Sequence, residues 1–184
     1  MNRPDETLML AIRRGDAQAF AALYDRYATR MYRFFYRMLG RDQERARDFT
    51  QEIFVKIIEK PQHYDPARPF ATWFYAVAMN MCKNEYRRQD KQQTERFSPD
   101  NHLEPDDFDP IGALDQPIFE QQLQRALDCL ADPHRRALML RFQEERSIRE
   151  ISEIENCPEG TVKSRLHHAV RQLAGLMESW KTTR

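Results

Sequence analysis

Glycine is scarce in this chain, with five among 184 residues, and cysteine is scarcer, with three. We find no glycine-rich loop of the kind that cradles phosphates, and the composition suits helices. Cys82, Cys129 and Cys157 lie far apart and form no Cys-x-x-Cys pair, which argues against a disulfide framework or a zinc ribbon. We therefore expect a reducing compartment, no metal site and no cofactor.

Long hydrophobic runs are also missing. No segment approaches the length that crosses a bilayer, and residues 1–6 lack the apolar core of a signal peptide. The sequence contains no His-Glu-x-x-His motif and no nucleophile constellation. We expect a cytoplasmic protein without membrane insertion that is not an enzyme.

Net charge carries no information about partners because it is zero, but the distribution of charge does. Residues 98–118 contain six acidic and no basic side chains, together with prolines that oppose regular structure. The chain therefore divides into a block at 1–96, an acidic flexible linker at 97–118 and a block at 119–184. No β-pattern of useful length occurs, so we predict an all-α fold of two small helical domains.

A short helix is predicted after Ser147, which forms a capping box with Glu150 three residues later. Its apolar residues Ile148, Ile151 and Ile154 recur at a spacing of three. Asn156 follows, and asparagine tolerates the left-handed conformation at which many helices end.

A second helix begins after Pro158 and is predicted to run from about Glu159 to Trp180. Apolar residues recur along it at spacings of three and four: Val162, Leu166, Ala169, Leu173 and Leu176. The two helices are typical of a helix-turn-helix, whose second helix enters the DNA major groove. Before them we expect helices at 119–130 and 132–142, the latter capped by Asp132.

The first block is predicted to contain four helices. Asp16 is a suitable N-cap for the second of these, a long helix rich in aromatic residues that ends at Gly40. The third helix begins near Asp42 and ends before Pro61. After a proline-rich loop, the fourth helix runs from Phe70 to about residue 89. The expected inward face of the third helix consists of Ala46, Phe49, Ile53, Phe54, Ile57 and Ile58.

Two surfaces in this block carry functional alternatives. Asp48 and Glu52 lie on the outer face of the third helix, where periodicity alone favours a solvated face over a protein-docking surface. In the fourth helix, aromatic residues stand beside cations, as in surfaces that bind single-stranded nucleic acid. Trp73 is nevertheless expected in the core, whereas Asn80 must face water, a buried partner or a base edge.

Two motifs in this order resemble a known family. The string Asp-x-x-Gln-Glu-x-Phe-x-Lys at 48–56 precedes Phe-x-x-Trp at 70–73, and the helix-turn-helix follows the linker. The chain resembles the extracytoplasmic-function sigma factors of bacterial RNA polymerase from about residue 17 to residue 176. Such a factor lends promoter specificity to the polymerase, so the implied partners are core RNA polymerase, promoter DNA and an anti-sigma factor.

The resemblance implies a role for each motif. Residues 1–96 would be sigma region 2, which docks on the polymerase and reads and melts the minus-ten element by capturing flipped-out bases. Residues 119–184 would be sigma region 4, which reads the minus-thirty-five element. The implied polymerase-binding residues are Asp48, Gln51, Glu52, Phe54 and Lys56. The implied minus-ten residues are Tyr64, Arg68, Phe70, Trp73, Asn80, Lys83, Arg87 and Arg88.

The implied minus-thirty-five residues are Thr161, Lys163, Ser164, Arg165, His167 and His168. The histidine pair departs from the family, which often has a large aromatic residue or arginine there. Neutral histidine neutralises fewer phosphates. An autonomous helix-turn-helix regulator is the main alternative, and it predicts tight duplex binding without polymerase. A protein-interaction adaptor is a third alternative.

Overall fold

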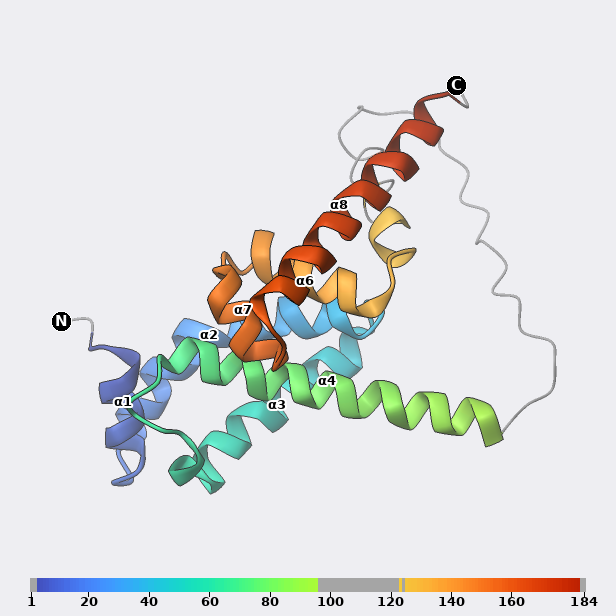
Figure 1. Ribbon diagram of the computed structural model, residues 1–184. Helices are drawn as coiled ribbons and strands as arrows, with labels where there is room; N and C mark the ends of the chain where they lie inside the picture. The colour runs from blue at the N-terminus through green and yellow to red at the C-terminus, as the bar shows by residue number, and fades with distance from the viewer. Residues whose placement is uncertain (1–2, 96–122, 124, 183–184) are drawn as a thin grey trace, which may run out of the picture. The chain divides into compact units, whose positions relative to one another are not determined.

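The computed structural model describes residues 3–95, 123 and 125–182, which form helices and turns without a β-strand. This confirms the all-α fold (Figure 1). The chain forms two compact units. The first contains α1 (Asp5–Ile12), α2 (Ala17–Met38), α3 (Gln43–Glu59), the short 3-10 helix η1 (Pro61–His63) and α4 (Phe70–Glu95). The second is built on α6 (Asp132–Phe142), α7 (Ile148–Glu155) and α8 (Glu159–Thr182).

The helix ends of the first unit follow from local sequence. Asp16 caps α2 by accepting hydrogen bonds from the backbone N–H groups of Gln18 and Ala19, each at 3.0 Å. The hydrogen bond from Ala19 is the main reason that the pKa of Asp16 is lowered. Asp42 caps α3 through the Arg45 N–H at 3.0 Å. Gly40, at φ +70°, ends the α2 segment as predicted.

Aromatic rings join the helices of the first unit. Helices α1 and α3 each pack against α2. Tyr27 of α2 meets Phe70 and Phe74 of α4 edge-on, with ring centroids 5.3 and 5.4 Å apart. Phe54 of α3 contacts the same Phe74 at 5.6 Å. The buried ring of Phe74 therefore connects three helices.

Two details of this unit differ from the prediction. Ile58 was expected to face inward but is 53% exposed, whereas Ile57 is buried. Adjacent residues of an α-helix point about 100° apart, so both cannot occupy the same narrow seam. Helix α4 also continues beyond residue 89 to Glu95.

The second unit contains the predicted two-helix motif. The Ser147 N–H donates to the Glu150 carboxylate at 2.8 Å and the Glu150 N–H donates to the Ser147 hydroxyl at 3.2 Å, which completes the capping box. Asn156 is left-handed, at φ 52°. Asp132 does not cap α6 as predicted. It is the first helical residue, and its carboxylate instead accepts from Arg135 at 2.7 Å.

The core of this unit is aliphatic, with buried Leu127, Leu130, Leu138 and Ala169. The predicted linker at 97–118 lies outside the described residues, and so do residues 119–122 and 124 of the helix predicted at 119–130. Across the part of the chain that the structure describes, none of the helices is both long enough and apolar enough for a membrane span.

Candidate functional site

The outer face of α3 presents most of the first predicted set. Asp48, Gln51, Glu52 and Lys56 are exposed. Glu52 and Lys56, which are four residues apart and therefore neighbours on the helix surface, form an ion pair at 2.9 Å. Phe54 is buried, 2% exposed, so its ring supports this face from behind. The α3 face therefore offers charge and amide groups without a hydrophobic anchor at position 54.

A cleft of 310 Å³ opens among α3, η1 and α4. Half-buried Trp73 forms an aromatic wall, while Lys56, Lys60 and His63 line the cleft together with one carboxylate, that of Glu59. An unpaired base can stack on an indole while cations hold its phosphates. The sequence predicted Trp73 as a minus-ten residue and Lys56 as a polymerase-binding residue. It missed Lys60 and His63, which lie within two residues of the Pro61 that begins η1.

The loop between η1 and α4 is held from inside by Tyr64. Its side chain is 1% exposed, and its hydroxyl donates to the Arg68 backbone oxygen at 2.6 Å. Burial, aided by the nearby carboxylates of Glu6, Asp65 and Asp5, raises the pKa of Tyr64 to about 12, so the hydroxyl keeps its proton at neutral pH. Phe70 is also fully buried, whereas Arg68 is exposed. Of these three predicted minus-ten residues, only Arg68 offers its side chain to a ligand.

A second hollow, of 400 Å³, lies between α3 and α4. It brings Glu52 and Lys56 of the first predicted set together with Asn80 and Arg88 of the second. Asn80, the amide that the sequence singled out, is exposed. Asn84, one helical turn further on, also lines this hollow and was missed. Amides at a spacing of four on a groove wall can donate to and accept from base edges or a peptide backbone.

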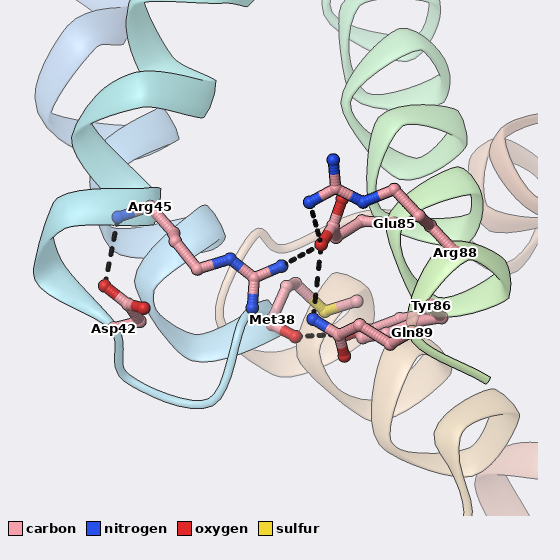
Figure 2. Close-up of polar contacts among 7 residues, drawn as sticks. All are labelled: Met38, Asp42, Arg45, Glu85, Tyr86, Arg88 and Gln89. Carbon is pink, nitrogen blue, oxygen red and sulfur yellow. Dashed lines mark hydrogen bonds and ion pairs between the residues drawn. The ribbon is translucent and has the colours of Figure 1, made fainter. Parts of the chain in front are cut away.

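A cluster around Glu85 fixes the wall of this groove (Figure 2). The buried Glu85 carboxylate accepts from Arg45 of α3, from Arg88 at 3.0 Å and from Gln89 at 3.3 Å. Figure 2 also shows the Tyr86 hydroxyl donating to the Met38 backbone oxygen. Arg88 remains largely exposed, and so does Arg87, while Lys83 lies one turn earlier on α4. The predicted cation Arg88 is therefore oriented by a carboxylate that the sequence did not single out.

In the second unit, α8 presents a polar face opposite its buried stripe. Lys163, Ser164, His167 and His168 are exposed. Thr161 and Arg165 are half-buried, and an Arg165 N–H lies 3.6 Å from the Cys157 sulfur in the turn. The Ser152 hydroxyl donates to the Cys157 backbone oxygen at 2.6 Å, which connects the two helices of the motif. The exposed group has the size and polarity of a major-groove reading surface.

The adjacent histidines His167 and His168 lie beside a third. The rings of His168 and His134 of α6 stack with centroids 5.7 Å apart, and His167 meets His168 at 5.9 Å. His134 was missed because it precedes the pair by more than thirty residues and no local motif marks it. The stack shows that His168 also contacts α6, in addition to its exposure on α8.

Comparison with known proteins connects the two units. Residues 23–92 match Sigma-70 region 2, and residues 120–173 match Sigma-70 region 4. The ECF RNA polymerase sigma factor SigW of Bacillus subtilis is 32% identical over 164 residues, covering 85% of this chain and 87% of SigW. SigL of Mycobacterium tuberculosis is 31% identical over 174 residues, covering 92% and 94%. The chain belongs to the ECF sigma factor family.

Solved structures agree with this sigma factor fold. CnrH, in complex with the cytosolic domain of CnrY, aligns with a TM-score of 0.71 at 19% identity, over 95% of this chain and 97% of that one. RpoE of Bartonella quintana, in complex with the anti-sigma factor NepR, aligns at 0.70 and 21%, over 88% and 98%. The present protein is an alternative sigma factor: it directs transcription initiation by RNA polymerase and is not itself an enzyme.

Proposed function

We propose that the two units divide promoter recognition between them, with region 2 at residues 1–96, a linker at 97–118 and region 4 at 119–184. The exposed face of α3, with Asp48, Gln51, Glu52 and Lys56, docks on core RNA polymerase. Its exposed charged and amide groups can form charge-complementary contacts with a partner, which supports this assignment. Buried Phe54 holds the face in place.

The cleft beside Trp73 receives an unpaired base of the minus-ten element. Capture of an extruded base offsets the few kcal/mol that opening the duplex costs. The supporting observation is the combination of an indole wall with Lys60 and His63, beside the single carboxylate of Glu59, around 310 Å³ of space. Arg68, Asn80, Lys83, Arg87 and Arg88 complete the DNA-facing set, while Tyr64 and Phe70 support it from the core.

Helix α8 reads the minus-thirty-five element through Lys163, Ser164, His167 and His168, with Thr161 and Arg165 at the edge of that surface. Promoter selectivity requires both this α8 surface and the minus-ten cleft. The sigma factor acts in the cytoplasm, where bacterial polymerase transcribes. An anti-sigma factor covers its docking and DNA-reading faces. In support, RpoE was solved in complex with the anti-sigma factor NepR, and CnrH in complex with the cytosolic domain of CnrY.

Transcription of a genomic DNA pool by purified core polymerase and this protein tests the proposal and identifies the promoter. Glu52→Lys abolishes transcription because it places a cation beside Lys56 on the docking face. Asp25→Lys, the same charge change at an exposed α2 position, retains it. Asn80→Ala lowers open-complex formation, measured by permanganate footprinting, more than promoter binding.

The region 4 assignment has its own readout. Arg165→Ala reduces promoter affinity by about 1–3 kcal/mol if the guanidinium contacts a base.

Each of the three variants has an outcome that would contradict its assignment. Full transcription by Glu52→Lys would place polymerase docking elsewhere. Normal opening by Asn80→Ala would remove this amide from the minus-ten site, and unchanged affinity of Arg165→Ala would remove that residue from the α8 surface.

A further inference from the structure

Helix α1 precedes the residues that match Sigma-70 region 2, and it makes contacts that the proposed surfaces do not use. Just after it, the Arg13 guanidinium donates to three backbone oxygens, two in η1 and one at the start of the loop that leads to α4. Its Nε lies 3.0 Å from the Pro61 oxygen, and a terminal nitrogen lies 3.4 Å from that of Gln62. The same nitrogen donates to the Tyr64 oxygen. The fixed geometry of a guanidinium suits three acceptors on one turn.

The far end of the loop is held from the same helix. A Glu6 carboxylate oxygen accepts from the Phe70 N–H at 3.0 Å. This N–H begins α4, and the preceding Pro69 has no side chain that can cap it. Glu6 therefore does for α4, from a distant segment, what Asp16 and Asp42 do locally for α2 and α3.

Helix α1 is itself anchored on α2. Asp5 accepts from the Tyr27 hydroxyl at 2.5 Å and from Arg26. Leu8 and Met9 are buried. The clamp on the loop therefore rests on the same rings that build the core of the first unit, because Tyr27 also contacts Phe70 and Phe74.

Movement of the loop would reach the base cleft through Tyr64. The Tyr64 ring lies 5.2 Å from Trp73 and 5.7 Å from Phe70, and its hydroxyl holds the Arg68 backbone. A loop that is ordered before DNA binds has less conformational entropy to lose when it captures a base.

We propose that Arg13 and Glu6 are positioning residues for minus-ten recognition, which hold residues 61–70 so that Trp73 and Arg68 meet the unpaired base. This inference rests on the proposed function of the cleft. It assigns to α1 a part in promoter selectivity without contact to DNA.

The test uses holoenzyme assembled from core polymerase and full-length variants, on the promoter recovered by the genomic transcription experiment with its minus-ten positions randomised. Sequencing of the transcribed templates gives the base preference. Arg13→Ala lowers the minus-ten preference about tenfold, as loss of a charged hydrogen-bond donor to the loop predicts, and leaves the minus-thirty-five preference unchanged. Arg14→Ala is the matched control, because it removes the neighbouring exposed arginine.

A conservative pair separates positioning from general stability. Glu6→Gln keeps an acceptor for the Phe70 N–H and retains more preference than Glu6→Ala. Amide hydrogen exchange of the free protein adds a readout without DNA: the Phe70 amide exchanges faster in Glu6→Ala, and residues 61–69 exchange faster in Arg13→Ala than in Arg14→Ala. If Arg13→Ala does not fold, Arg13→Lys serves instead, because it keeps the positive charge but lacks the planar guanidinium donors. Its loss of minus-ten preference should lie between those of wild type and a full tenfold reduction.

The outcomes distinguish the inference from the function on which it rests. If Trp73→Ala leaves the minus-ten preference intact, the cleft does not read that element and both ideas are overturned. If Trp73→Ala flattens the preference while Arg13→Ala and Arg14→Ala behave alike, the inference alone is overturned. Equal losses at the minus-ten and minus-thirty-five elements in Arg13→Ala would also overturn it, because they indicate general destabilisation.

Discussion

The two units achieve rigidity by different means. In the first, rings from three helices meet around Phe74, whose centroid lies 5.4 Å from that of Tyr27, 5.6 Å from Phe54 and 5.1 Å from Phe70. The core of the second unit is aliphatic, and its helix-turn-helix is shaped by caps and a left-handed residue within ten positions of one another. The first unit is held by contacts between distant segments, and the motif in the second by contacts between neighbours.

This difference fits the two proposed tasks. A duplex-reading helix needs a fixed angle to its partner helix, which a short turn can impose. A base-capturing cleft needs walls from several elements, and here α3, η1 and α4 all contribute. In this proposal, long-range contacts such as the hydrogen bonds from Arg13 to the loop contribute to recognition of the minus-ten element.

The largest expected effect is on the aromatic core. Phe74→Ala should lower the free energy of unfolding of the first unit by about 3–5 kcal/mol, because the lost ring leaves a cavity among three helices. Leu138→Ala makes the corresponding cavity in the second unit. Urea unfolding followed by circular dichroism measures both, whereas the fluorescence of the tyrosines, which all lie between residues 24 and 86, reports on the first unit alone. If both variants shift one shared transition, the units unfold together and the comparison between them is broken.

The Glu85 cluster should give the next largest effect. Glu85→Ala leaves Arg45 without this carboxylate and exposes the groove wall, with a loss of about 2 kcal/mol. We expect no larger loss of stability, because the Arg88 side chain is 68% exposed and water can hydrate it once the Glu85 carboxylate is removed. Asp25→Ala, at an exposed position of α2, is the control for loss of a carboxylate. The thermal unfolding midpoint of the first unit measures the change, and equal midpoints for the two variants would contradict a role for the cluster.

Sequence reasoning succeeded where the determining contacts were local. The caps at Asp16 and Ser147, the helix start near Asp42, the left-handed Asn156 and the order of helices all follow from residues within a few positions. The predicted cap at Asp132 was the local exception, because this residue is already helical. The family resemblance was also correct, because its two motifs have fixed spacings.

Sequence reasoning failed where tertiary packing determined which residues are buried or paired. Helical periodicity cannot show that Ile57 occupies the seam and Ile58 does not. Nor can it show that Tyr64 is buried by contact with Phe70 and Trp73, or that Glu85 joins Arg45 across forty residues. Those contacts depend on where whole helices come to lie, and no local pattern records them.

A smaller effect is expected at the turn between α7 and α8. Asn156→Ala should cost about 1 kcal/mol, because alanine is disfavoured at φ 52°. Asn156→Gly should be nearly neutral, since glycine adopts this conformation readily. Thermal unfolding of the second unit, together with promoter binding by the holoenzyme, measures both variants. A loss in the glycine variant equal to that in the alanine variant would show that the asparagine side chain, and not its backbone conformation, stabilises the turn.

The smallest effect concerns the capping box and depends on pH. Burial alone would raise the pKa of Glu150, but hydrogen bonds from the Ser147 backbone and side chain and from Arg146 outweigh it and lower the pKa below the ordinary 4.5. The stabilisation of the fold by the ionised Glu150 carboxylate is therefore complete above about pH 4.5 and is lost as the pH falls through the lowered folded-state pKa.

Glu150→Gln should lower the unfolding free energy of the second unit by about 0.5–1 kcal/mol at pH 7, with the difference between variant and wild type vanishing in acid. Glu159→Gln, in the exposed first turn of α8, should show a smaller change. Parallel curves for wild type and Glu150→Gln from pH 3.5 to 7 would mean that the carboxylate does not stabilise this helix end, and the local half of the comparison would then rest on Asn156 alone.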